Sequence, residues 1–378
     1  PAQLVKALLN DAGGKQWALV RDGNFLELSK LGAFAGNDIT AIFQAAISEI
    51  GGNEGTMVLP YAPENNPCLV SSELTIRSNI AVIGSSANKR NHWIKVPNST
   101  GLSIFRANNR SNIAFLDFCI DNNGTNQTSG QTINVTNTDG ILIDNLLVKD
   151  AQSAVVLVDT GCNDVHIGKI FAEGGGDLNS RGVSINESTN ITVESVDMVD
   201  YTGSGINISG CTGVNLGQFR GSRDYATLGW TSGKGAVRLT NNCKDVTIGT
   251  IYADGFSRGL FVLTGSSDVS VASVRIKNCE TQGIWIEGDD GSATTGGGKV
   301  SIASGSVSNT GLGVGLDYSV YLSDTENNII SGIICDGDII EANVNATSNK
   351  NIITSCRATG VITTVGANTV AANNIAGA

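Results

Sequence analysis

A short apolar phrase recurs along the chain and limits the folds that the chain can adopt. The phrase is a polar residue followed by Ile or Val, any residue, and a second Ile, Val or Phe. Its alternation has a period of two, which predicts β-strands rather than helices. Successive copies begin 23 to 33 residues apart, which indicates a fixed coil whose loops vary in length. The copies begin at Ile80, Ile113, Ile141, Val165, Ile191, Val214, Val246, Val269, Val300, Ile329 and Ile352.

One copy of this unit cannot bury its own apolar face, so the copies are expected to stack into a solenoid. A leucine-rich repeat is excluded, because the asparagine precedes the strand and leucine is not dominant. We therefore predict an all-β fold, a right-handed parallel β-helix of about eleven coils. The β-helix domain is predicted over residues 37–378, and residues 1–36 form a lead-in segment.

One amphipathic helix is predicted at residues 38–50. Asn37 and Asp38 can cap its first turn, an apolar stripe follows at helical spacing, and Gly51 ends it. A stack of strands leaves an open apolar end, and a capping helix would cover that end.

Asparagine and aspartate gather at one turn of the predicted coil, directly before the strands. Their side chains can bond to the backbone of their own turn, and they tolerate the left-handed conformation. These residues are Asn79, Asn112, Asp164, Asn190, Asp245, Asp268, Asn328 and Asn351. Cys162, Cys211 and Cys243 each lie three residues before a strand start, which favours a column of free thiols over disulfides.

Charge and composition exclude several classes of function. The net charge of −11 argues against a general binder of nucleic acid or of anionic membranes, because both need a basic face. No apolar run approaches the ~20 residues of a membrane helix. The chain has two histidines, far apart, and no Cys-x-x-Cys pair, so no metal site is predicted.

The opening segments resemble the pectin-lyase-like β-helix superfamily, and most of all its bacteriophage tailspike and capsule-depolymerase domains. The resemblance is carried by DITAIFQAAISEIGG, by the GTMVLP that follows, and by SSELTIRSNIAVIG. It implies a homotrimeric, polysaccharide-cleaving spike on the virion tail surface, or alternatively a secreted or cell-surface bacterial protein. It assigns no catalytic residue.

Laid in register, the coils place an acidic residue after the first strand of successive copies: Asp150, Glu173, Asp200, Asp224, Asp254 and Glu280. Carboxylates on adjacent coils would be about 5 Å apart, and those two coils apart about 10 Å, which bracket the separations in retaining and inverting glycosidases. We predict the catalytic acid and base among Asp200, Asp224 and Asp254. Arginines and aromatic residues at the same level are predicted to bind the sugar chain together with the last acid: Tyr201, Arg223, Tyr225, Trp230, Arg258, Glu280 and Trp285. An ordinary solvated face is the structural alternative.

The leading hypothesis is hydrolysis, without a cofactor, of a bacterial surface polysaccharide such as capsule or O-antigen. A polysaccharide lyase is the first alternative; it would use Arg223, Arg258 or Lys277 as a base and could require calcium. A glycan-binding or structural spike without catalytic activity is the second. Exposed Ile and Val near the C-terminus suggest contacts with further subunits.

Overall fold

The computed structural model describes residues 8–10, 16–18, 25–50, 54–85, 88–97, 101, 103–127, 129–175, 181–229, 234–288, 298–313, 318–342, 348–366 and 368–377. The chain forms two compact units, Pro1–Gly175 and Gly176–Ala378, called here the N-terminal and the C-terminal unit. Each unit is a right-handed parallel β-helix, which confirms the predicted fold class.

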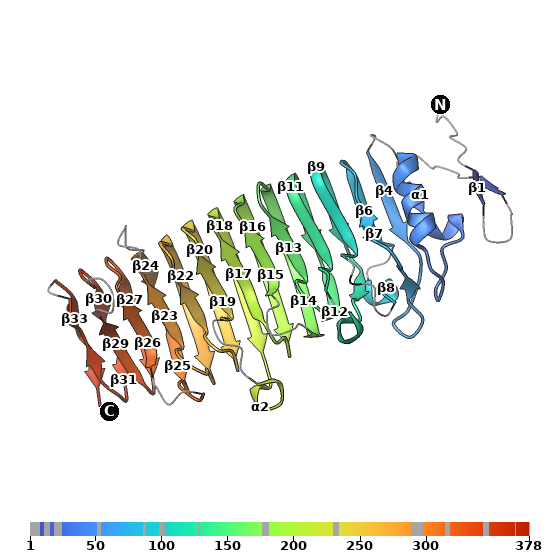
Figure 1. The fold of residues 1–378 in the computed structure, drawn as a ribbon. Helices are drawn as coiled ribbons and strands as arrows, with labels where there is room; N and C mark the ends of the chain where they lie inside the picture. Colours follow the sequence, from blue (N-terminus) through green and yellow to red (C-terminus); the bar gives the residue numbers. More distant parts are fainter. Residues whose placement is uncertain are drawn as a thin grey trace. The chain divides into compact units, whose positions relative to one another are not determined.

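In the N-terminal unit, strands of successive coils pair in parallel and in register (Figure 1). Ile80 pairs with Ile113, Ile113 with Ile141, and Ile141 with Val165, and all four side chains are buried. The predicted strand starts therefore form one inward-facing stack here. The elements are β1 (Leu8–Asn10), β2 (Gln16–Ala18), β3 (Phe25–Glu27), η1 (Leu28–Leu31), α1 (Thr40–Ile50), β4 (Gly55–Leu59), β5 (Cys68–Leu69), β6 (Leu74–Thr75), β7 (Ile80–Gly84), η2 (Lys89–Asn91), β8 (Trp93–Lys95), β9 (Phe105–Leu116), β10 (Cys119–Asp121), η3 (Gly124–Asn126), β11 (Ile133–Asp144), β12 (Leu146–Ala151), β13 (Val156–Asp159) and β14 (Asn163–Gly175).

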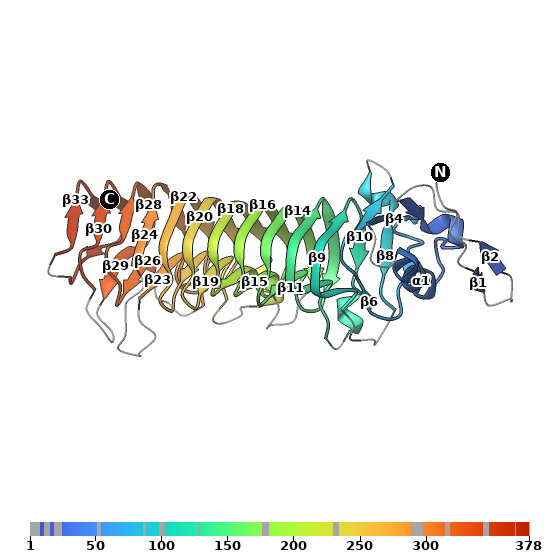
Figure 2. The same ribbon diagram turned by 90° about the horizontal axis from the view of Figure 1, so that it is seen from above.

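Helix α1 lies beside β4 at one end of the N-terminal unit (Figures 1 and 2). Asp38 accepts a hydrogen bond from the Thr40 N–H at 2.9 Å, and the helix begins at Thr40, two residues after the predicted start. Phe43 and Ile47 are buried, and the Phe43 ring lies 5.9 Å from the Phe105 ring of the coil. The helix therefore packs its apolar face onto the coil interior. Strand β3, which lies within residues 1–36, pairs with β4.

In the C-terminal unit each full coil has three faces. The first face consists of the starts of β16, β18, β20 and β22, followed by β24, β27, β30 and β33. The second consists of the ends of those four long strands, followed by β25, β28, β31 and β34. The third consists of β15, β17, β19, β21, β23, β26, β29 and β32.

Inside this unit the starts of the first-face strands stack again, from Ile191 through Val214 and Val246 to Val269. The elements are β15 (Arg181–Asn186), β16 (Thr189–Val199), β17 (Ser204–Ser209), β18 (Thr212–Ser222), α2 (Tyr225–Leu228), β19 (Val237–Thr240), β20 (Lys244–Asp254), β21 (Leu260–Val262), β22 (Ser267–Lys277), β23 (Ile284–Glu287), β24 (Gly298–Ile302), β25 (Gly305–Ser308), β26 (Tyr318–Ser323), β27 (Ile329–Ser331), β28 (Ile333–Cys335), β29 (Asp338–Ala342), β30 (Ile352–Thr354), β31 (Arg357–Ala358), β32 (Ile362–Thr363), β33 (Val370–Ala372) and β34 (Ile375–Ala376).

The turn before the first face has the predicted left-handed conformation in most coils, but the register changes near the C-terminus. Asp245 and Asp268 have φ of 54° and 56°, whereas in the last coils Asn327 and Lys350 take this conformation, with φ of 60° and 55°. Asn328 lies one residue later and is fully buried. The predicted turn role of Asn328 and Asn351 is therefore wrong, because both side chains point inward. They hydrogen-bond to neighbouring coils.

The shift of register turns the neighbouring isoleucines outward. Ile329 and Ile352, predicted as inward strand starts, are 42% and 39% exposed and pair with each other on the first face. Val370, which pairs with Ile352, is 51% exposed. The last coils therefore carry an exposed aliphatic row on this face.

All eight cysteines are free and buried, which confirms the predicted thiol column. Cys211 and Cys243 donate from Sγ to the Ile185 and Ile208 carbonyl oxygens, both at 3.4 Å. Burial raises the pKa of Cys211 to about 11, so this thiol stays protonated at neutral pH.

Candidate functional site

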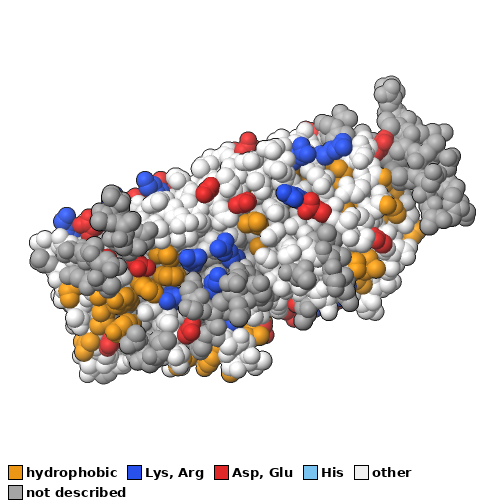
Figure 3. Space-filling view, in the orientation of Figure 1, with side chains coloured by type: hydrophobic (Ala, Val, Ile, Leu, Met, Phe, Trp, Pro, Cys, Tyr) orange, Lys and Arg blue, Asp and Glu red, His pale blue; other side chains and the backbone are white. Residues whose placement is uncertain are grey.

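One row of side chains on the third face of the C-terminal unit combines arginine with aromatic rings. Three of its members are half-buried, and Asn207 and Phe261 are buried. The strands of this face lie side by side, and their register brings Asn207, Arg238, Phe261, Trp285 and Tyr321 into line. Along each strand these residues alternate with residues whose side chains point into the apolar core, as expected for β-strands. We call these five residues the arginine–aromatic row. Figure 3 shows Lys and Arg side chains gathered beside hydrophobic ones near β19 and β23.

The aromatic members of the row support one another. The rings of Phe261 and Trp285 stack at 5.0 Å with an interplanar angle of 29°, and Tyr321 meets Trp285 edge-on at 5.8 Å. Tyr318 stacks on Tyr321 at 5.3 Å. The Trp285 Nε1–H donates to Ser323 Oγ at 3.1 Å, which fixes the orientation of the indole. Trp285 is half-buried, so part of its ring is available to a ligand.

Arg258 lies against two of these rings. Its guanidinium carbon is 4.5 Å from the ring centroids of both Phe261 and Trp285, and its Nε–H donates to Gln282 Oε1 at 3.3 Å. The residue is 8% exposed, and its Nη1 has no hydrogen-bond partner among the described residues. Burial lowers the pKa of Arg258 to about 10, although the nearby carboxylate of Glu280 favours the charged form.

Two more arginines lie in the neighbourhood of Arg258: Arg238 acts on it electrostatically, and Arg223 is influenced by the same carboxylate, Glu280. Arg223 is 5% exposed and donates from Nη2 to the carbonyl oxygens of Leu228 and Gly229. Arg238 donates from Nη1 to Asn207 Oδ1 at 3.3 Å. In each of the two arginines the Nε lacks a partner among the described residues. Burial lowers the pKa of both, and in Arg238 the charge of Arg181 adds to the effect.

The three predicted catalytic aspartates do not form one row. Ser222 pairs with Val199 and with Asp254, so Asp200 lies one position, and Asp224 two positions, further along the turn than Asp254. The Asp254 carboxylate accepts hydrogen bonds from Lys277 Nζ at 2.9 Å and from Asn278 Nδ2 at 2.6 Å. The predicted acidic column with one carboxylate per coil is therefore wrong, because its members belong to different positions of the turn.

Asp224 has a structural role that conflicts with acid catalysis. It caps the short helix α2: its Oδ1 accepts from the Ala226 N–H at 3.2 Å and its Oδ2 from Thr227 Oγ1 at 2.7 Å. The hydrogen bond from Thr227 lowers the pKa of Asp224, so this carboxyl is ionised at neutral pH. It therefore cannot serve as the protonated group that assists a leaving oxygen. Asp200 Oδ1 accepts from the Asp224 N–H at 3.0 Å.

The predicted substrate-binding residues divide into those that converge and those that do not. Glu280 lies close enough to influence the pKa of Arg223 and of Arg258, and its Oε2 accepts from Ser257 Oγ at 2.6 Å. Glu280 and the two arginines therefore converge, and Trp285 joins them through its contact with Arg258. Tyr201, in contrast, is fully buried, with its hydroxyl 3.3 Å from the Arg181 carbonyl oxygen. Its prediction as a sugar-stacking residue is wrong, because the ring is part of the core.

Tyr225, also predicted to bind the substrate, is not a member of the row. Tyr225 is half-buried in α2, and Trp230 falls outside the described residues. Arg238, Phe261 and Tyr321 are members of the row that the sequence reasoning missed. Their signal is periodic: Arg238, Phe261 and Trp285 are spaced by 23 and 24 residues, which is the length of the shortest coils.

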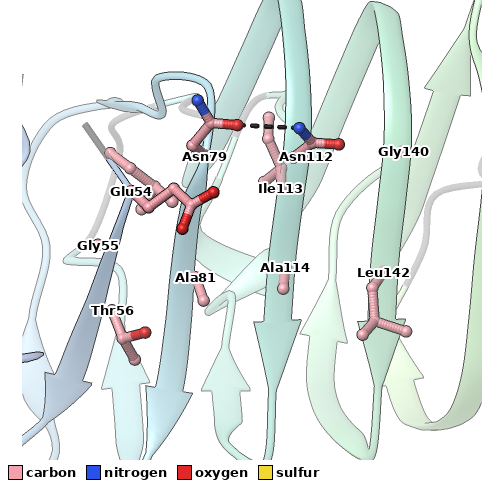
Figure 4. A pocket seen from close by; sticks show the side chains of 11 residues that line it. Glu54, Gly55, Thr56, Asn79, Ala81, Asn112, Ile113, Ala114, Gly140 and Leu142 are labelled. Carbon is pink, nitrogen blue, oxygen red and sulfur yellow. Dashed lines mark hydrogen bonds between the residues drawn. The ribbon is translucent and has the colours of Figure 1, made fainter. Parts of the chain in front are cut away.

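The N-terminal unit contains a separate shallow pocket on the outer side of β4, β7, β9 and β11, with a volume of about 390 Å³ (Figure 4). Thr56, Ala81 and Ala114 are paired across the strands, and their short side chains leave the hollow. Leu142 and Glu54 complete its lining with backbone and amide groups. Glu54 is the only carboxylate of its lining, so the pocket does not contain the paired carboxylates that a glycosidase uses.

No helix among the described residues is long and apolar enough to cross a membrane. No group of three or more His, Cys, Asp or Glu side chains among them could hold a metal ion.

Comparison with known proteins identifies the fold. No protein-family model and no curated protein matches the chain. Solved structures do match. The A-module of the mannuronan C-5 epimerase AlgE6 of Azotobacter vinelandii has a TM-score of 0.74 at 16% identity, over 93% of this chain and 98% of that one. The enzymatically active domain of bacteriophage CBA120 tailspike protein 2 has a TM-score of 0.58 at 12% identity, over 94% of this chain and 50% of that one. ORF18 of Geobacillus virus E2 has a TM-score of 0.56 at 14% identity, over 91% of this chain and 66% of that one. These neighbours are pectin-lyase-like parallel β-helix proteins, and the chain shares their fold.

Proposed function

We propose that this chain binds and cleaves a bacterial surface polysaccharide on the third face of its C-terminal unit. The observation that carries the proposal is the arginine–aromatic row, in which a partly exposed Trp285 is held between Phe261 and Tyr321 beside Arg258. Aromatic faces stack on pyranose rings, and charged groups bond to hydroxyls and acidic substituents. The structural neighbours support the proposal, because one is an epimerase named for mannuronan and another is the enzymatically active domain of a tailspike.

Hydrolysis by a pair of carboxylates remains the leading chemistry, and Glu280 and Glu287 are now its strongest candidates. Both act electrostatically on Arg258, and Glu287 follows Trp285 by two residues on β23, on the same side of the strand. One carboxyl would protonate the leaving oxygen and the other would activate water or attack the sugar. Asp200 and Asp254 remain as alternatives on the adjoining turns, whereas Asp224 is already ionised and occupied as a helix cap.

β-Elimination on a uronic acid is the second candidate, and one observation favours it. Burial lowers the pKa of Arg258 to about 10 and also lowers the pKa of Arg223. An arginine that is to take a proton from a sugar carbon must lose its own proton more readily than usual, and burial has this effect. This reaction could require calcium.

The test is an assay on purified capsular and O-antigen polysaccharides that reads reducing ends and ultraviolet absorbance in parallel. Hydrolysis releases reducing ends alone, whereas elimination also creates a double bond that absorbs in the ultraviolet. For hydrolysis we expect Glu280→Gln and Glu287→Gln each to lower the rate by about 10²- to 10⁴-fold. Glu194→Gln is the matched control, since Glu194 is exposed in β16, which is not a strand of the third face. Binding without either product would support a non-catalytic, glycan-binding spike instead.

We also propose a homotrimer on the virion tail surface. Two of the structural neighbours are phage or virus proteins, and the aliphatic row of Ile329, Ile352 and Val370 offers an apolar contact surface. Light scattering on the purified chain tests the oligomeric state, and a monomeric mass at micromolar concentration would refute the trimer.

A further inference from the structure

We propose that the polysaccharide carries an anionic group in its repeating unit, and that Arg223, Arg238 and Arg258 bind this group. The inference rests on the proposed function for the nature of the polymer, and adds the charge of the substrate and the residues that select it. Its basis is a set of buried guanidinium nitrogens that the described protein leaves without partners.

Each of the three arginines has one nitrogen in this state. They are Nε of Arg223, Nε of Arg238 and Nη1 of Arg258. Arg223 and Arg258 are more than nine-tenths buried, at 5% and 8% exposure. A buried donor without an acceptor is costly, and more so when it is charged, so native proteins rarely keep one without a reason. Three such donors around one region indicate an acceptor that binds there.

The charges around the three arginines also indicate that an anionic acceptor binds there. The charge of Arg181 contributes to the lowered pKa of Arg238, and the charge of Arg238 contributes to the lowered pKa of Arg258, because like charges lie close together. Glu280 and Glu287 favour the charged form of Arg258, but no described carboxylate forms an ion pair with Arg223, Arg238 or Arg258 within 4.0 Å. The region is therefore a local excess of positive charge on a chain whose net charge is −11.

A glycine lets the strand backbone come close to Arg258 and Phe261. Val237 pairs with Ile206 and with Leu260, so Gly235 occupies the position between Ser204 and Arg258. A Cβ at Gly235 would lie 3.3 Å from the Phe261 Cβ and 3.6 Å from the Arg258 carbonyl oxygen. A side chain at position 235 would therefore crowd Phe261, and glycine allows the close approach of this backbone to the arginine–aromatic row. The hydroxyl of Ser204, which is 1% exposed, has no partner among the described residues and offers one more donor at this position.

A carboxylate or a phosphate fits this set of donors, since both accept several charge-assisted hydrogen bonds from guanidinium groups. Trp285, next to Arg258 in the row, would stack on the sugar that carries the group or on its neighbour. The shared chemistry is thus an oxyanion on a glycan.

Equilibrium binding of three polymers tests the inference. A polyuronate supplies carboxylates, a polyribitol phosphate supplies phosphates, and dextran is neutral. We expect the wild-type chain to prefer one of the two polyanions to dextran, and the preferred polymer identifies the group. Arg238→Gln and Arg258→Gln should each weaken its binding about 10- to 100-fold, as expected for the loss of a charge-assisted hydrogen bond. Arg275→Gln removes the same charge from the exposed side of β22 on the second face and should change binding less than about twofold.

A thermal melt separates binding from folding. If the arginines serve ligand binding, Arg238→Gln will melt at the wild-type temperature or above, because it relieves repulsion. A lower melting temperature together with lost binding would overturn the inference in favour of a structural role. An equal loss in Arg275→Gln, or a wild-type preference for dextran, would overturn it as well.

The outcomes also separate this inference from the proposed function. Cleavage of a neutral polysaccharide at an unchanged rate in Arg238→Gln would refute the anionic site and leave the depolymerase intact. Arginine-dependent binding of a polyanion without any cleavage product would support the anionic site and refute the depolymerase.

Discussion

The contact between Arg258 and Trp285 gives the sharpest energetic prediction of the structure. The guanidinium carbon lies 4.5 Å from the indole centroid, and Arg258 is 8% exposed. A cation over an aromatic ring contributes about 0.5–1 kcal/mol at an exposed site and about 2 kcal/mol when it is desolvated. Because the Phe261 ring lies at the same distance from the guanidinium carbon and remains in every variant, we expect a coupling of about 1–2 kcal/mol.

A double-mutant cycle measures this coupling. The chain, Arg258→Gln, Trp285→Leu and the double variant are unfolded in urea and followed by far-ultraviolet circular dichroism. The cycle removes the separate effects of lost repulsion and lost stacking, which each single variant carries. Arg220 and Tyr252 form the control pair: they are 5.4 Å apart, and the Arg220 side chain is 64% exposed. We expect about 0.5 kcal/mol there.

A coupling between Arg258 and Trp285 no larger than that of the control pair would refute the reasoning. It would mean that the arginine does not rest on the ring in solution. The arginine–aromatic row would then lack the prearranged geometry on which the proposed glycan site depends.

Three further predictions concern the core. Asn351→Ala removes the acceptor of the Asn328 N–H at 3.0 Å and of its Nδ2 at 2.8 Å, and should lower the free energy of unfolding by about 2–4 kcal/mol in a urea titration; a change below about 0.5 kcal/mol would contradict the buried network. Tyr201→Phe should leave polysaccharide cleavage unchanged, since the ring is fully buried, and a tenfold loss of rate would restore a direct role for this residue. Burial raises the pKa of Cys211 to about 11 and of Cys279 to about 12, whereas the unfolded thiol has a pKa of 9.0. Above about pH 9 the unfolded chain therefore binds fewer protons than the folded one, so stability should fall as pH rises, by up to about 1.4 kcal/mol per pH unit and thiol. Urea midpoints at pH 8 and pH 10.5 test this slope, which Cys211→Ser should reduce.

Sequence periodicity was sufficient for the fold, because the inward stack requires Ile or Val at equivalent positions of every coil. Ile191, Val214 and Val246 follow this rule, and the structure pairs them. The rule failed near the C-terminus, where Asn328 fills the inward position and Ile329 faces outward. Alternating apolar and polar residues predict a strand whichever of the two faces inward, so the pattern alone could not determine which one is buried.

The candidate site was harder to predict, because it depends on register across turns of unequal length. Asp200, Asp224 and Asp254 lie at similar distances from the apolar residues that start their strands, yet the register gives them three different positions along the coil. Hydrogen bonding decides the state of each carboxyl, and Asp224 is committed to a helix cap that is not apparent from its spacing. The arginine–aromatic row could have been predicted from the sequence, since its members recur at the period of the coils.

The varying length of the corner between the second and third faces has a consequence for the evolution of such a chain. Between β16 and β17 this corner takes the four residues 200–203, and between β18 and β19 the fourteen residues 223–236. The strands on both sides nevertheless keep their register, with Val199 opposite Ser222 and Ile206 opposite Val237. Lengthening a flexible loop from four to fourteen residues costs only about 1 kcal/mol of closure entropy. Insertions at this corner can therefore reshape the surface next to the proposed glycan site, while the register of the strands is inherited unchanged.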